Sequence, residues 1–82
     1  MPGVTVNLYA AARAAVGVPT LSAPAGTLAE ILSGISGDHP AFRRVWPQCS
    51  FLVDGLALHG DPQAAEVPDG SVVDVLPPFA GG

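Results

Sequence analysis

The residues Thr27-Leu28-Ala29-Glu30-Ile31-Leu32 begin the stretch that decides the fold of this 82-residue chain. Thr27 can cap the first turn of a helix with its hydroxyl, and Glu30, three positions later, can cap Thr27 in return. Apolar residues recur at helical spacing, at positions 28, 31, 32 and 35. We therefore predict one main amphipathic helix that starts after Thr27 and ends near Gly34 or Gly37.

Segments on both sides of this helix have the alternation of half-buried strands. We predict strands over residues 4–9 and 18–23 before the helix, and over residues 49–53, 56–59 and 71–76 after it. An alanine-rich stretch at 10–16 predicts a helix of about two turns. His39-Pro40 begins a predicted helical turn through Val45 that Pro47 closes. One capped helix among short strands indicates an α+β fold with the helix on one face of a sheet.

The composition excludes several classes of function. Hydrophobic residues make up 49% of the chain and the net charge is −4, with three arginines and no lysine. Such a chain lacks the basic stripe that nucleic-acid binding needs. It also has no apolar run long enough for a membrane span and no pattern of a signal peptide. A single cysteine cannot form an internal disulfide, so we expect a reducing, cytoplasmic location.

No set of side chains predicts a catalytic or metal site within the body of the chain. Cys49 has no neighbouring base and is most simply a small hydrophobic residue at the start of a strand. His39 and His59 do not stand at ligand spacing with Cys49, so no zinc site is expected. Arg43 and Arg44 are most simply a solvated helical surface. We expect the isolated chain to have no catalytic turnover.

The ending Leu76-Pro77-Pro78-Phe79-Ala80-Gly81-Gly82 is the exception. The two prolines cannot extend a sheet and favour a stiff, extended exit. The final glycines have no side chain, so a partner can close tightly around their backbone. We predict a domain over residues 1–76 and an extended tail over 77–82 that inserts its carboxylate into another protein.

This ending resembles that of the MoaD/ThiS sulfur carriers, and in particular the small subunit of molybdopterin synthase. Two further segments are similar to the same family, Tyr9-Ala10-Ala11-Ala12-Arg13-Ala14-Ala15-Val16-Gly17 and Pro68-Asp69-Gly70-Ser71-Val72-Val73-Asp74-Val75. Ala14 departs from the family, because many relatives have an acidic residue after the arginine. The resemblance implies a β-grasp, ubiquitin-like fold: a mixed sheet of four to five strands with one main helix packed on one face.

The resemblance also implies a chemical cycle at Gly82, with Gly81 beside it. An E1-like adenylating enzyme (MoeB-like) would use ATP to activate the Gly82 carboxylate, and a sulfur donor would convert it to a thiocarboxylate. The large subunit of molybdopterin synthase (MoaE-like) would then receive the tail, whose sulfur forms the molybdopterin dithiolene. The chain itself would bind no cofactor and would be the non-catalytic, sulfur-donating subunit of the complex.

Three alternatives stay open at this point. The same tail chemistry serves sulfur carriers of thiamine and cysteine biosynthesis. A ubiquitin-like modifier would instead join Gly82 to a lysine of a target protein. A third possibility is a non-covalent binding module with an idle tail.

The alternation of the first and last strands predicts where partners bind. If Val73 and Val75 face the helix, then Tyr9 and Leu76 lie on the opposite face of the sheet. We expect Leu56 or Leu58 to join them in an apolar docking surface at the root of the tail. The expected contacts with partners are Tyr9, Arg13, Leu56, Leu76, Pro77, Pro78, Phe79 and Ala80. Arg44 is expected on the far side.

Overall fold

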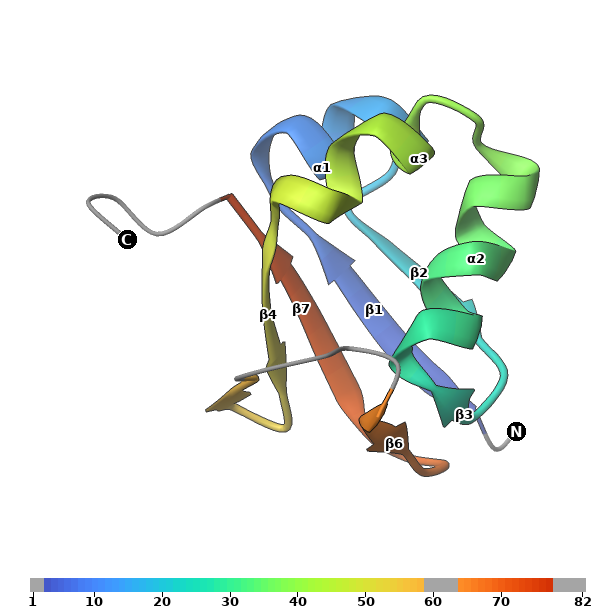
Figure 1. The fold of residues 1–82 in the computed structure, drawn as a ribbon, viewed down its shortest axis with the longest axis vertical. Coiled ribbons are helices and arrows are strands. Elements are labelled where there is room, and N and C mark those ends of the chain that lie inside the picture. The colour runs from blue at the N-terminus through green and yellow to red at the C-terminus, as the bar shows by residue number, and fades with distance from the viewer. Residues whose placement is uncertain (1–2, 59–63, 78–82) are drawn as a thin grey trace.

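The structure, a computed structural model, describes residues 3–58 and 64–77. Its main sheet has five strands in the order β2-β1-β7-β4-β5 (Figure 1). β1 and β7 are parallel neighbours at the centre, and the other pairs are antiparallel. The strands are β1 (Val4–Leu8), β2 (Thr20–Ala23), β4 (Ser50–Val53), β5 (Leu56–Ala57) and β7 (Val72–Leu76). This mixed sheet confirms the predicted α+β class.

The helices cover one face of this sheet and the end at which β1 and β7 finish (Figure 1). Between β1 and β2 lies α1 (Ala10–Val16), which Gly17 ends in a left-handed conformation with φ 90°. The main helix, α2 (Leu28–Asp38), packs across the sheet and leads into α3 (Phe42–Val45) and the 3₁₀ helix η1 (Trp46–Gln48). Pro47 lies inside η1, so it does not close the helical turn at Val45 as predicted.

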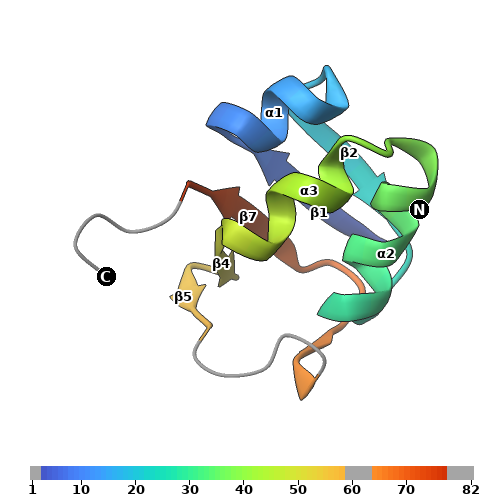
Figure 2. The same cartoon turned by 45° about the horizontal axis from the view of Figure 1, so that its top comes forward.

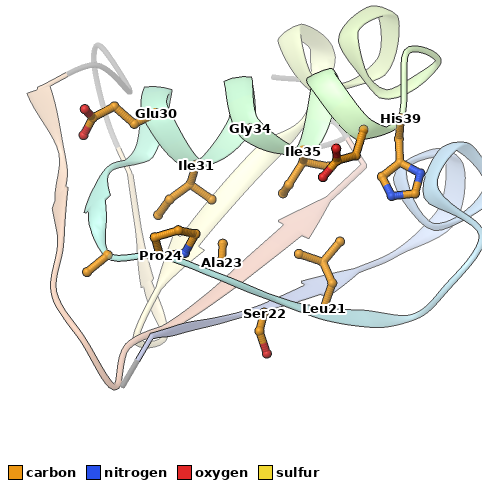
Figure 3. A pocket seen from close by; sticks show the side chains of 11 residues that line it. Leu21, Ser22, Ala23, Pro24, Glu30, Ile31, Gly34, Ile35 and His39 are labelled. Carbon is orange, nitrogen blue, oxygen red and sulfur yellow. The ribbon is translucent and has the colours of Figure 1, made fainter. Parts of the chain in front are cut away.

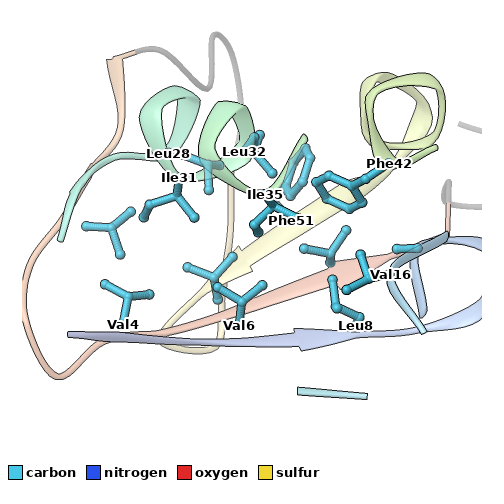
Figure 4. Close-up of a cluster of buried hydrophobic side chains, with 14 residues drawn as sticks. Val4, Val6, Leu8, Val16, Leu28, Ile31, Leu32, Ile35, Phe42 and Phe51 are labelled. Atoms are coloured by element: carbon cyan, nitrogen blue, oxygen red, sulfur yellow. The ribbon is translucent and has the colours of Figure 1, made fainter. Parts of the chain in front are cut away.

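The hydrophobic core fills the space between the helices and the sheet (Figure 4). Alternate residues of the two central strands point into it, so the strand faces are as the sequence predicts. Phe42 from α3 is fully buried and extends the core beyond the single predicted helix. The buried apolar residues are Val4, Val6, Leu8, Ala12, Val16, Leu28, Ile31, Leu32, Ile35, Phe42, Phe51, Val67, Val73 and Val75.

The main helix is longer than predicted, since it passes through both Gly34 and Gly37 and ends at Asp38. Two interactions hold its last turn. Ile35 is buried in the core, and the Ser36 hydroxyl donates a hydrogen bond to the Leu32 carbonyl at 2.9 Å. Packing of this turn therefore outweighs the low helix propensity of glycine, which the sequence prediction followed.

A short ribbon of two strands, β3 (Gly26–Thr27) and β6 (Glu66–Val67), was not predicted. The sequence prediction treated Gly26 as part of a turn. The ribbon forms because Val67 is buried in the core and because Leu28 N–H donates to the Ala65 carbonyl at 2.9 Å. It brings the chain before β7 against the start of α2.

The predicted capping box is present where the ribbon meets α2. Glu30 N–H donates to Thr27 Oγ1 at 3.2 Å, and Thr27 N–H donates to Glu30 Oε1 at 2.8 Å. A side chain at Gly26 would place its Cβ 2.7 Å from the same Glu30 oxygen, so glycine leaves room for the cap. The cap therefore fixes both the helix start and the ribbon beside it.

We expect Thr27→Ala to lower the free energy of unfolding by about 1 kcal/mol, because one helical N–H loses its partner. In a domain of this size that loss lowers the melting temperature by about 4–8 °C. Thermal melting followed by circular dichroism measures the change. Ser33→Ala, at an exposed position of the same helix, is the matched control and should melt at or slightly above the wild-type temperature. Equal melting of the two variants would contradict the capping role.

The predicted turn at Asp54-Gly55 joins β4 to β5 and is fastened to the start of β7. Both residues have positive φ, 51° and 82°, as a tight hairpin turn requires. The Asp54 carboxylate accepts hydrogen bonds from Val72 N–H at 2.9 Å and from Ser71 Oγ at 2.8 Å. These two bonds, the one from Val72 first, hold the pKa of Asp54 below its ordinary value of 3.8.

This lowered pKa predicts how stability depends on pH. A carboxylate whose pKa is lower in the folded state stabilises the fold above its unfolded pKa, and the effect is lost as pH falls through the folded value. We expect Asp54→Asn to melt below the wild type at neutral pH and the gap to narrow below about pH 4. Melting temperatures of both proteins between neutral and strongly acidic pH test this. A gap that stays constant would show that Asp54 acts only through its backbone.

The other predicted turn, Pro68-Asp69-Gly70, is present, with φ 88° at Gly70. The predicted strand at 56–59 is reduced to β5, and its last residue, His59, lies outside the described residues. Within residues 3–58 and 64–77, no helix combines the length and the apolar character that a bilayer span requires.

Candidate functional site: the root of the C-terminal tail

The predicted tail begins at the end of the central strand β7. Leu76 is the last residue of that strand and Pro77, which follows it, is exposed. Pro78, Phe79, Ala80, Gly81 and Gly82 lie outside the described residues, so the predicted roles of these five residues stay predictions. The structure therefore describes the root of the tail and the surfaces around it.

The sheet face opposite the helices has a polar chain at its centre. Thr20 Oγ1 donates to Asn7 Oδ1 at 3.1 Å, and Asn7 Nδ2 donates to Asp74 Oδ1 at 3.0 Å. The Tyr9 hydroxyl lies 3.5 Å from the same Asp74 oxygen. This chain joins β2, β1 and β7 across the open face and orients the Tyr9 ring.

Tyr9 and Leu76 share this open face at the root of the tail, as predicted. Tyr9 N–H donates to the Val75 carbonyl at 3.2 Å, which places Tyr9 beside the last residues of β7. The Tyr9 side chain is 44% exposed, and Leu76 is half-buried. Leu52, which the sequence analysis did not single out, lies on the same face because it pairs with Asp74. Two half-buried leucines and a tyrosine thus surround an acidic centre.

Leu56 and Leu58 do not join this surface, so their predicted position is wrong. Leu56 pairs with Val53, and Val53 pairs with the buried Val73, so all three belong to the helix side of the sheet. Leu58 N–H donates to the Phe51 carbonyl, and the Leu58 side chain packs against the core. The prediction failed because a tight hairpin turn decides which face a return strand presents.

A small cavity of about 140 Å³ lies on the helix side of the tail root. Pro77 forms part of its wall together with residues of α1, α3 and η1, which converge near the end of β7 (Figure 2). Arg44 lies on the helix side, as predicted, but it lines this cavity together with Tyr9. It is exposed and close to the tail, so it is not a remote position.

Cys49 also lines this cavity, and its thiol is partly buried. The thiol donates a weak hydrogen bond to the Val45 carbonyl at 3.4 Å. Burial raises the pKa of the Cys49 thiol above its ordinary value of 9.0. The thiol is therefore protonated at neutral pH, and a protonated thiol is a poor nucleophile.

We expect Cys49→Ala to accept sulfur at its C-terminus at a rate within about twofold of wild type, because a raised thiol pKa removes the nucleophilic thiolate. Intact mass spectrometry of the loaded protein measures this rate. The wild-type protein, whose thiol can be blocked by alkylation after loading, is the control. Lost loading in a variant that melts like wild type would assign Cys49 a chemical role.

The remaining predicted site residue, Arg13, is exposed in α1, one turn after Tyr9. Its role in partner binding stays a prediction. Among the residues that the structure describes, no three His, Cys, Asp or Glu side chains cluster as they would around a metal ion.

The arrangement of β1, β7 and α2 agrees with a comparison against protein families. The model of the ThiS family matches residues 6–82, which includes both the central strands and the Gly81-Gly82 ending. The chain belongs to the ThiS family. No match was found among curated proteins.

Solved structures share the fold of this ThiS-family protein. SAMP1, a small archaeal modifier protein from Methanosarcina acetivorans, is similar with a TM-score of 0.77 and 23% identity, over 100% of this chain and 99% of that one. A candidate molybdopterin converting factor, subunit 1, from Pyrococcus furiosus has a TM-score of 0.77 and 23% identity, over 96% and 100% of the two chains.

A third similar structure is a complex of subunits 1 and 2 of the molybdopterin-converting factor from Helicobacter pylori. Its TM-score is 0.67 and its identity 20%, over 100% of both chains. At these identities the likeness shows the fold alone. The chain therefore has the ubiquitin-like β-grasp fold, which ThiS-family sulfur carriers and archaeal modifiers share.

Proposed function

We propose that this protein is the sulfur carrier and small subunit of a molybdopterin synthase. The observation that carries the proposal is the family match, which extends through Gly82. The structure supports it at the root of the tail, because the core ends with Val75 and the next strand residue already lies on the open face. Residues after Val75 are thus free of any duty in the described core.

The chemistry follows from the weak reactivity of a carboxylate. An E1-like adenylating enzyme joins the Gly82 carboxylate to AMP from ATP and releases pyrophosphate. Hydrosulfide, or an equivalent sulfur donor, then attacks the acyl carbon, and the bond to AMP breaks. The product is a thiocarboxylate whose ionised sulfur is a strong nucleophile. The carrier holds no cofactor in this cycle, since ATP binds to the activating enzyme.

The proposed acceptor is a pterin precursor held by a MoaE-like large subunit. The tail would enter the large subunit, and its glycines would pass through a channel too narrow for larger side chains. Support for this acceptor comes from the proline-rich tail and from the fold shared with two molybdopterin-converting subunits. Carriers for thiamine or cysteine synthesis would use the same tail with a different acceptor.

Intact mass spectrometry tests the proposal. The protein ending at Gly82 is incubated with ATP, a MoeB-like enzyme and sodium sulfide, and we expect a mass gain equal to one oxygen replaced by sulfur. The loaded protein, a MoaE-like subunit and the pterin precursor should then produce molybdopterin. Reactions without ATP or without the large subunit are the controls. Loading without molybdopterin formation would favour another sulfur pathway, and absence of loading would reject the carrier function.

The second candidate is a ubiquitin-like modifier, and the fold shared with archaeal SAMP1 favours it. The first step is the same, but a lysine amine of a target would attack the adenylate and form an isopeptide bond. The chain has no lysine of its own, so it cannot build polymers through its own lysines. Digestion of cell extracts followed by mass spectrometry would detect tagged lysines if this second function operates.

A further inference from the structure

The largest cavity on the described surface is a groove of about 460 Å³ between β2 and α2 (Figure 3). Leu21 and Ala23 point into it from β2, and Ile31 and Ile35 point into it from α2. Ser22 points away, to the open face of the sheet. None of the residues lining this groove lines the cavity at the root of the tail. The groove is therefore a surface separate from the proposed sulfur site.

One wall of the groove is a sheet edge with free hydrogen-bonding groups. In the part of the chain that the structure describes, β2 pairs only with β1. Leu8 N–H donates to the Pro19 carbonyl, and bonded pairs alternate in an antiparallel ladder, so Leu21 and Ala23 bond β1. The backbone N–H and C=O groups of Thr20 and Ser22 consequently point away from the sheet.

Gly34 opens the other wall. A Cβ at this position would meet nothing within 4 Å, so the packing of the fold does not require glycine there. Glycine inside a helix costs about 1 kcal/mol relative to alanine. Gly37 lies in the same helix with equal space around it but does not line the groove. The two glycines thus form a natural pair for an experiment.

The charges at the rim are acidic. Glu30 and Asp38 line the groove, and none of the three arginines of the chain does. Eight residues of helix separate the two carboxylates, which is about 12 Å along the axis. About four residues of an extended chain span that distance. An extended ligand with a basic residue at each end would match this spacing.

We propose that this groove binds an extended segment of a partner protein, which adds a strand to β2 and places alternate apolar side chains between β2 and α2. The segment carries lysine or arginine at its ends, facing Glu30 and Asp38. Main-chain bonds to Thr20 and Ser22 supply affinity, and the apolar groove supplies selectivity, as in other cases of strand addition. The proposal goes beyond the sulfur-carrier function and does not depend on it.

A competing interpretation is that β2 is simply a protected edge. Pro19 and Pro24 bracket the strand, and proline on an edge hinders pairing with other chains. The same prolines limit any added strand to the short stretch around Thr20 and Ser22. The two interpretations differ in whether a matching peptide binds, so binding decides between them.

The probe is the acetylated and amidated peptide Lys-Val-Thr-Ile-Thr-Val-Lys, titrated into ¹⁵N-labelled protein and followed by NMR. We expect saturable shifts at the amides of Thr20, Ser22 and Gly34, with a dissociation constant below about 1 mM. Gly34→Leu should weaken binding about tenfold or more, because its side chain fills the groove, whereas Gly37→Leu should stay within about twofold. A peptide with Glu in place of both Lys should bind more weakly at low salt.

Several outcomes would overturn the proposal. Absence of shifts up to about 1 mM peptide would leave β2 a protected edge. Equal weakening by Gly34→Leu and Gly37→Leu, with both variants folded by thermal melting, would remove the groove as the binding site. A dimer of the peptide-free protein that Gly34→Leu dissociates would assign the groove to a second copy of this chain. Sulfur loading of Gly34→Leu should equal wild type in every case, so failure here is distinguishable from failure of the carrier function.

Discussion

Deletion of Gly82 is expected to lower sulfur loading by more than about 100-fold and to leave the fold unchanged. The shortened chain still ends in a glycine carboxylate, but that group is drawn back by about 3.3–3.6 Å, the length of one extended residue. A displacement of even about 1 Å from the productive geometry can reduce a rate about 100-fold. Intact mass spectrometry after incubation with ATP, the activating enzyme and sulfide measures the loss.

Gly81→Trp tests the same tail by size instead of length. Its carboxylate stays in place, but the indole cannot enter a channel that closes around the glycine backbone. Gly37→Ala, in open space on α2, is the matched glycine substitution and should load like wild type.

All three proteins should keep a melting temperature no lower than about 2 °C below wild type, because neither tail glycine belongs to the described core. Normal loading of the shortened protein would show that Gly82 is not the reacting residue.

Leu76→Asp is expected to weaken binding of both the activating enzyme and the large subunit by about tenfold or more. Leu76 lies on the open face beside Tyr9, one residue before the exposed Pro77. A partner that receives the tail must cover this position, and an aspartate there would be buried without a partner and near Asp74. Truncation of a central interface residue often costs 2 kcal/mol or more, which corresponds to about 30-fold in affinity.

Calorimetric titration of each partner with the variant measures this effect. The matched control is Val72→Asp, which places the same charge on the same face of the same strand. Val72 is four residues before Leu76, about 13 Å farther from the tail, and is also half-buried. We expect it to weaken binding less than Leu76→Asp. Arg44 is a poor control, because it lines the small cavity beside Pro77. Unchanged binding of folded Leu76→Asp to both partners would exclude this face as their shared docking surface.

Local patterns in the sequence were sufficient for the parts of the fold that depend on neighbours along the chain. Alternation placed Val73 and Val75 inside and Leu76 outside, because successive side chains of a strand point to opposite faces. Thr27 and Glu30 located the helix start, because the capping box involves residues only three positions apart. The tail motif indicated the family, and the family model matches through it.

Contacts between distant residues decided the rest. The β3–β6 ribbon joins residues about forty positions apart through two residues on each side, too short for any periodic pattern. The face of Leu56 depends on the turn before it, and the length of α2 depends on the burial of Ile35 against the sheet. The groove beside Gly34 exists only because β2 is the sheet edge that runs alongside α2. Sequence periodicity indicates which side of an element is apolar, but only tertiary packing decides what that side meets and which edge stays open.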